Sequence, residues 1–214
     1  HDPVTTTDEL IPSGETSSFR SNPLGLAEFT LSRKDPQYVG RAKAVQLAEK
    51  ARTAGKGEAG MTEATPELGS VLSAIRTSYP VDAARTQVGS VIYAVKPGDG
   101  SAREQASSCQ KVRGGLANIA GEYATKRYRS NLINWGMLPF LLDGGDELPF
   151  ENGDFLFIPG IRTAVKEKAA EIRAYVVRDG LKEFTLRLGE LTDDEREIIL
   201  KGCLINYYRQ GNAD

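Results

Sequence analysis

Apolar residues recur at helical spacing in the first half of the chain. Segments 35–55 and 65–79 carry them three or four residues apart, and the first opens on Asp-Pro and ends in Lys and Arg near a Gly, as helices do. A shorter helical face spans 23–31. Residues 4–18 are rich in Ser and Thr and residues 53–61 in Gly, Ala and Lys, so both are predicted as loops, the second of them mobile.

From residue 88 onward, short apolar runs alternate with polar segments of helical spacing. Strands are predicted at 88–95, 116–120, 137–142, 155–158, 172–177 and 183–188, and helices at 101–112, 123–135 and 192–208. Strands that alternate with helices indicate an α/β core. The last three strands have no long helix between them, so part of the sheet is predicted to be mixed or antiparallel.

The most informative motif lies where the strand at 88–95 gives way to the helix at 101–112. Residues 98–106 read Gly-Asp-Gly-Ser-Ala-Arg-Glu-Gln-Ala. The first N–H groups of a helix lack partners and attract an anion, and glycines allow a ligand to approach the backbone. We expect Ser101 at the N-cap or in the first turn, where these N–H dipoles and Arg103 favour an ionised hydroxyl that acts as a base. The alternative on pattern alone is a simple N-cap.

Basic residues in two places are candidates for binding an anion. Arg20 lies in a polar loop without a helical carboxylate partner, and segment 99–129 holds six Lys and Arg against three acidic residues. Arginine suits carboxylates, so a small multi-carboxylate substrate fits better than a polyanion. The alternatives are a solvated surface charge for Arg20 and a solvated helix face for Lys126, Arg127 and Arg129.

Composition excludes several function classes. The 214 residues include 27 Lys plus Arg against 29 Asp plus Glu, so no general basic field exists and nucleic acid is not an expected partner. No apolar stretch could span a bilayer and no leader pattern opens the chain, so we expect a soluble, cytoplasmic protein.

Cys109, Cys203 and a single histidine, His1, cannot supply a three- or four-ligand metal site, and both cysteines are expected on helices as small buried residues. Without a usable histidine, Ser101 does not fit a serine hydrolase.

Three segments, in order along the chain, resemble motifs of the C-terminal swivelling domain of the aconitase family. Residues 98–106 resemble its Gly-x-Gly-Ser-Ser-Arg-Glu-His-Ala motif. Residues 6–14, followed by Phe-Arg at 19–20, resemble its Thr-Thr-Asp-His-Ile-Ser-x-x-Gly segment, and residues 131–139 resemble its Thr-Asn-Leu-x-x-x-Gly-Leu-Leu-Pro helix end. The resemblance implies that residues 1–214 form a single β/β/α swivelling domain, an α/β fold with a mixed sheet and flanking helices.

The resemblance also implies a chemistry, the reversible dehydration and hydration of a hydroxy di- or tricarboxylic acid by a hydro-lyase. Ser101 would be the base, Arg20 and Arg103 would bind substrate carboxylates, and Ala102 would contribute its backbone N–H. A [4Fe–4S] cluster on other domains of the family polarises the leaving hydroxyl. This chain is expected to carry no cluster ligands, to need cluster-bearing domains as partners and to be inactive alone.

The sequence departs from the family motifs at three positions. Ala102 replaces the second serine, Gln105 replaces a histidine, and Glu9 replaces the histidine of Thr-Thr-Asp-His. These departures bear on which hydroxy acid is the substrate. The chain opens with His1 rather than Met, which indicates a tag remnant, a fragment of a longer chain or a separate small subunit. The alternative function is a non-catalytic anion-binding or regulatory module.

Overall fold

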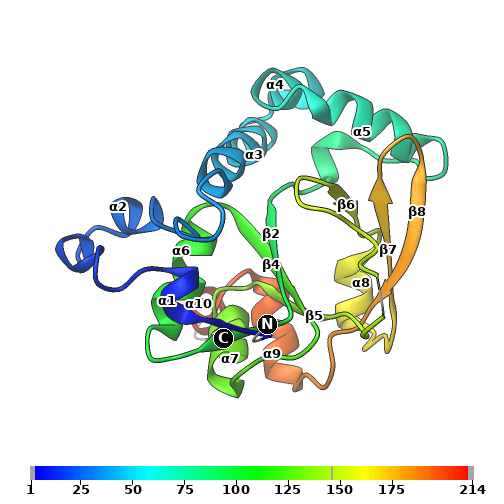
Figure 1. Cartoon of the computed structure of the whole chain (residues 1–214). Coiled ribbons are helices and arrows are strands. Elements are labelled where there is room, and N and C mark those ends of the chain that lie inside the picture. The colour runs from blue at the N-terminus through cyan, green and yellow to red at the C-terminus, as the bar shows by residue number, and fades with distance from the viewer. Residues whose placement is uncertain (1–2, 146, 212–214) are drawn as a thin grey trace.

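The computed structural model describes residues 3–145 and 147–211 (Figure 1). Its helices are α1 (Thr7–Leu10), α2 (Pro23–Ala27), α3 (Tyr38–Thr53), α4 (Gly57–Ala64), α5 (Glu67–Arg76), α6 (Arg103–Val112), α7 (Lys126–Asn134), α8 (Ile161–Lys166), α9 (Asp193–Lys201) and α10 (Leu204–Gly211), with two 3-10 turns, η1 (Ser17–Phe19) and η2 (Ala83–Arg85). The strands are β1 (Val4–Thr6), β2 (Ser90–Ala94), β3 (Lys96–Asp99), β4 (Gly115–Ala120), β5 (Leu138–Leu141), β6 (Phe155–Phe157), β7 (Ile172–Val177) and β8 (Leu181–Leu186).

A parallel sheet lies at the centre, in the order β2-β4-β5. Helices α6 and α7 are the connections into β4 and β5, as the alternation of strands and helices predicted. Strand β4 is buried along almost its whole length and is apolar except for Asn118, the pattern of a strand covered on both faces. The expected α/β core is therefore confirmed.

An antiparallel sheet, in the order β6-β7-β8, packs against the same core (Figure 1). Buried residues of both sheets and of α9 form one cluster, which includes Ile119, Phe140, Val176 and Ile199. A bridge between Leu141 and Arg187 joins the two sheets at their edges. Parallel and antiparallel pairing thus occur together, as the sequence predicted.

The predicted loop at 4–18 is wrong in its first part. Residues 4–6 form β1, which pairs in parallel with β3, and α1 follows at once. Strand β3 itself lies between the strand predicted at 88–95 and the helix predicted at 101–112, where no separate strand was predicted. Both strands are short and depend on each other, so no local apolar pattern marks them.

The predicted mobile loop at 53–61 is also wrong. Residues 57–64 form α4, and Met61 is fully buried against Ala48, Leu68 and Leu72. Small Gly and Ala residues let α4 approach α3 closely, and a single large side chain provides the buried anchor.

The predicted helix at 192–208 is broken into α9 and α10. Gly202 ends α9 with a left-handed φ of 89°, a conformation that glycine adopts without strain. Predicted helices at 35–55, 65–79, 101–112 and 123–135 are confirmed as α3, α5, α6 and α7, with ends shifted by a few residues. The short helix α8 was not predicted.

Candidate active site

Ser101 lies in the turn that joins β3 to α6. Gly98 and Gly100 shape this turn with φ values of 101° and 121°, where side chains other than hydrogen cause strain. Ser101 was expected at the N-cap or in the first turn, but the N-cap is Ala102 because the Gly100 turn takes up Ser101 before the backbone becomes helical. No side chain caps this helix. The Ser101 side chain is exposed, so its hydroxyl is open to a ligand, and the first N–H groups of α6 lack a side-chain partner.

Arg103, the first residue of α6, folds back over the same turn. Its Nη1 donates a hydrogen bond to the carbonyl oxygen of Gly100. A guanidinium carries five N–H donors, so others remain available beside Ser101. The turn therefore combines a free hydroxyl, unpaired N–H groups and a fixed positive charge.

The Thr-Thr-Asp segment lies directly beside this turn. Strand pairing places Thr6 opposite Asp99. Thr7 is buried, and a Cβ built on Gly100 would come within 2.3 Å of the Thr7 Oγ1. Two motifs that lie far apart in the sequence therefore meet at Gly100.

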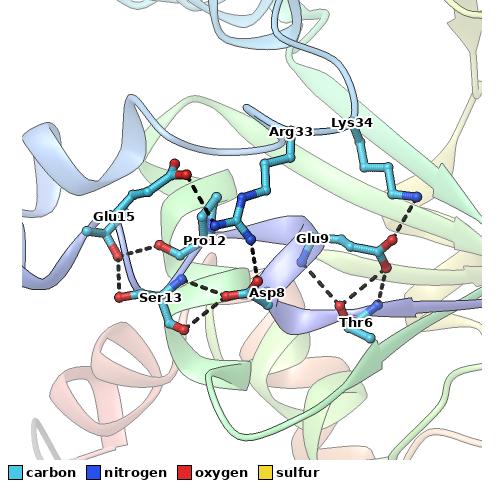
Figure 2. A network of polar contacts seen from close by, with 9 residues as sticks. Thr6, Asp8, Glu9, Pro12, Ser13, Glu15, Arg33 and Lys34 are labelled. Atoms are coloured by element: carbon cyan, nitrogen blue, oxygen red, sulfur yellow. Dashed lines mark hydrogen bonds and ion pairs between the residues drawn. The ribbon is translucent and has the colours of Figure 1, made fainter.

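A network of polar contacts fixes α1 (Figure 2). Thr6 and Glu9 cap each other: the Thr6 Oγ1 accepts from the Glu9 N–H at 3.2 Å, and the Glu9 carboxylate accepts from the Thr6 N–H at 2.8 Å. Lys34 pairs with the same carboxylate at 2.7 Å, and this contact, with the Thr6 N–H, lowers the pKa of Glu9. Glu9, which stands where the family motif has histidine, thus closes and caps α1 in this chain.

Asp8 fixes the loop that follows α1 (Figure 2). Its carboxylate accepts from the N–H and the hydroxyl of Ser13, both at 2.9 Å, and pairs with Arg33 at 2.5 Å. The Ser13 contacts, followed by Arg33, lower the pKa of Asp8. Arg33 also reaches Glu15 at 3.2 Å, so the segment that leads to Arg20 is tied down at several points.

Arg20 directly follows η1 in this segment. It is exposed and has no hydrogen bond or ion pair with any residue that the structure describes. Phe19 anchors the loop, because its ring lies 5.3 Å from that of Phe29 and packs on the core shared by α1, α2, α6 and α7. Asn22 caps α2 by accepting from the Gly25 N–H at 3.0 Å. The guanidinium therefore sits on an anchored loop and is free to bind an anion.

Helix α6 links the two parts of the candidate site. Arg113, at its C-cap, is buried, and its Nη2 donates to the Leu24 carbonyl at 2.8 Å and pairs with Glu28. These contacts tie the end of α6 to α2, just after Arg20, while the start of α6 carries the Ser101 turn. Within the described ranges no contact joins Arg20 to Ser101, so the two lie on separate elements that are packed through α6.

A buried ring of hydrogen bonds that the sequence did not predict lies beneath the turn. Gln110 donates to Tyr128 at 2.9 Å, Tyr128 donates to Asn118 at 2.6 Å, and Asn118 donates back to Gln110 at 2.6 Å. Burial raises the pKa of Tyr128, which keeps its hydroxyl able to donate. The Tyr128 ring lies so close to Gly98 that a Cβ there would be 2.3 Å away. Only the buried polar residues themselves could have signalled this network.

A second contact that the sequence did not predict lies at the start of α6. The Glu104 carboxylate accepts from the Asn131 Nδ2 at 2.9 Å and from the Trp135 Nε1 at 2.8 Å. Both donors belong to the segment that resembles the third family motif. Helix α7 is thereby joined to the first turn of α6.

The basic residues of segment 99–129 do not form one patch. Lys126 and Arg127 are exposed on α7, which fits a solvated helix face. Arg129 donates to the Glu190 carbonyl at 2.5 Å, and Arg113 is buried and paired as described. The last two therefore stabilise the fold, and Arg103 is the basic residue at the turn.

The two cysteines differ in their surroundings. Cys109 is buried on α6, as predicted, and burial raises its pKa to about 11. Cys203 is half-buried between α9 and α10, so the helical position expected for it is wrong, because the chain leaves the helix at Gly202. His1 lies outside the described residues.

The donors of the described residues do not fit an iron-sulfur cluster. No three His, Cys, Asp or Glu side chains within 3–145 and 147–211 are grouped so that they could hold a metal ion. Over the same ranges, no helix is both long and apolar enough to cross a bilayer.

The sequence matches no protein-family model and no curated protein. The structure is similar to the crystal structure of 3-isopropylmalate dehydratase from Methanocaldococcus jannaschii, with a TM-score of 0.56 and 24% sequence identity. The match covers 98% of this chain and 89% of that chain. The chain therefore shares the fold of this dehydratase over nearly its whole length, and the expected α/β fold with a mixed sheet and flanking helices is confirmed.

Proposed function

We propose that this chain is the swivelling domain of an aconitase-like hydro-lyase and supplies one wall of its active site. The observation that carries the proposal is the turn before α6, where an exposed Ser101 hydroxyl lies beside Arg103 and uncapped helix N–H groups. The fold shared with a dehydratase supports the same class of reaction. Residues 1–214 act as one unit in this proposal.

Ser101 is the base. N–H dipoles and a guanidinium favour the ionised form of a hydroxyl at this position. The Ser101 alkoxide takes the proton from the carbon next to a substrate carboxylate, and the electron pair of that C–H bond forms the C=C bond. The hydroxyl on the neighbouring carbon departs with its C–O electron pair as hydroxide, and an acid outside this chain would add the proton that makes it water. Hydration is the reverse, with the Ser101 hydroxyl returning the proton.

Arg20 and Arg103 bind the substrate carboxylates, and the Ala102 N–H adds a backbone donor. Arginine offers paired N–H groups in the geometry of a carboxylate, so two arginines on separate segments orient a molecule with at least two carboxylates. The substrate class is a hydroxy di- or tricarboxylic acid. Isopropylmalate, the compound in the name of the structural neighbour, is the first member to test.

A partner completes the site. A [4Fe–4S] cluster, held by domains on the same polypeptide or on a large subunit, would supply a Lewis acid for the departing hydroxyl. This chain alone is then inactive, because its own residues provide only the base and the carboxylate contacts.

The experiment combines this chain with the cluster-bearing partner from the same organism and measures interconversion of isopropylmalate isomers. Ser101→Ala is expected to lower kcat at least about a hundredfold, because a positioned base contributes that much. Ser108→Ala, on the helix that follows the Ser101 turn, is the matched control and should retain full activity. A complex that binds dicarboxylates without turning them over would instead support the non-catalytic binding module.

A further inference from the structure

Glu104 is the second residue of α6, directly after Arg103. An acidic side chain in this position is attracted to the free N–H groups and the positive end of its own helix. The proposed function uses the same helix N-terminus to favour the ionised Ser101, and it assigns the Ala102 N–H beside it to a substrate carboxylate. A Glu104 carboxylate that turned toward these N–H groups would therefore compete with the substrate.

The structure directs the Glu104 carboxylate to α7 instead. Its Oε1 accepts from the Trp135 indole at 2.8 Å, and its Oε2 accepts from the Asn131 amide at 2.9 Å. Each oxygen thus has a donor on α7. Hydrogen bonds with a charged acceptor are stronger than neutral ones, so these two contacts hold the carboxylate in this orientation.

The end of α7 that carries Trp135 is itself fixed. Trp135 is the C-cap, and its backbone N–H donates to the Asn131 and Leu132 carbonyls, both at 3.2 Å. At the next residue, a Cβ built on Gly136 would lie 1.9 Å from the carbonyl oxygen of Gly202. This close packing against the corner between α9 and α10 fixes the backbone that carries the Trp135 indole.

We propose that Trp135 and Asn131 are positioning residues that hold the Glu104 carboxylate away from the start of α6. The turn at residues 101–103 thereby stays open to a substrate carboxylate. This inference rests on the proposed function and adds two residues that touch neither substrate nor the reacting atoms.

A single NMR signal tests the contact itself. Trp135 is the only tryptophan of the chain, so its indole N–H gives one resonance in the full-length protein. Glu104→Gln is expected to shift this resonance and to speed its exchange with water about fivefold. The control Glu63→Gln changes an exposed glutamate of α4 and should leave it unaltered. A Trp135 indole resonance that is the same in Glu104→Gln and in the wild type overturns the proposal.

Kinetics of the complex with its cluster-bearing partner separate positioning from structural support. The variant Trp135→Phe/Asn131→Ala removes both donors to the Glu104 carboxylate, which can then compete with the substrate at the start of α6. KM for isopropylmalate should therefore rise about fivefold while kcat stays unchanged. Adding Glu104→Gln removes the competing charge and should return KM toward the wild-type value. If KM stays high or rises further in the triple variant, Glu104 only braces the fold and the proposal fails.

Two further measurements keep the test decisive. Trp135→Phe alone keeps an aromatic ring and replaces the double variant if that variant does not fold. If the wild-type complex has no hydro-lyase activity, the proposed function fails. The dissociation constant of malate, measured from the amide signals of residues 101–103, then replaces KM. It should rise in the double variant and return toward the wild-type value in the triple variant. A malate affinity that is equal in all of them, or absent in the wild-type chain, overturns the inference.

Discussion

The Thr7 hydroxyl lies against Gly100, so closely that a Cβ on Gly100 would be 2.3 Å from the Thr7 Oγ1. This contact packs the Thr-Thr-Asp segment onto the turn that carries Ser101. Because Gly100 also has a φ of 121°, no other residue type fits here without moving Thr7 or the turn.

Gly100→Ala is therefore expected to lower the free energy of unfolding by about 2 kcal/mol. The measurement is urea denaturation followed by circular dichroism. Gly14→Ala is the control, because a Cβ at Gly14 meets nothing within 4 Å and its φ is not in the left-handed region. Equal stability of the two variants would show that Thr7 and Gly100 are not packed as described.

The two candidate carboxylate contacts predict a change in KM. Arg20→Lys and Arg103→Lys keep the charge but lose the paired N–H geometry, so each should raise KM for the dicarboxylate about tenfold in the complex with the partner. Arg85→Lys, an exposed arginine of η2, is the control. If KM is the same in all three variants, carboxylate binding lies elsewhere.

The buried ring of hydrogen bonds predicts a stability difference between two tyrosines. Tyr128→Phe leaves the buried Asn118 Oδ1 without a donor and removes one of the two acceptors of the Gln110 Nε2, so the free energy of unfolding should fall by about 2 kcal/mol. Tyr208, which is 60% exposed, provides the control Tyr208→Phe with little expected effect. Denaturation midpoints of both variants decide the matter, and a Tyr128→Phe protein as stable as wild type would contradict the network.

Acid should loosen the segment that presents Arg20. The pKa values of Asp8 and Glu9 lie below their ordinary values of 3.8 and 4.5, chiefly through Ser13 and Lys34 respectively. A lowered pKa contributes stability that is fully present above the ordinary value and is lost as pH falls through the lowered one. The Ser13 amide signal should therefore stay constant at neutral pH and titrate below 3.8, and the titration should vanish in Asp8→Asn. A midpoint at or above 3.8 would contradict the Asp8 contacts.

Much of the fold was readable from local pattern. Strand β4 is a mostly apolar run, and helix α6 begins after a glycine-rich turn, so their positions were predicted to within a few residues. Strand β1 and helix α4 were missed for physical reasons. β1 exists because it pairs with distant β3, and α4 is held by one buried Met61 among small residues, so neither has a local signal.

The candidate site was only partly readable. Glycines before a helix marked the Ser101 turn, because their chemistry is local. The contacts of Glu104 with Trp135, and of Arg113 with Glu28, join residues far apart in the sequence, and nothing in either residue type says which partner it will meet. Glu9 is a similar case. The sequence showed only that a glutamate replaces the histidine of the motif, and the structure shows that this glutamate caps α1.

The central claim, that Ser101 is the base, is tested most directly by proton exchange in heavy water. The complex of this chain with its cluster-bearing partner should incorporate deuterium at the carbon next to a carboxylate of isopropylmalate. Ser101→Ala should slow that incorporation at least about a hundredfold, while Ser108→Ala leaves it unchanged. Incorporation by Ser101→Ala at the wild-type rate would contradict the account.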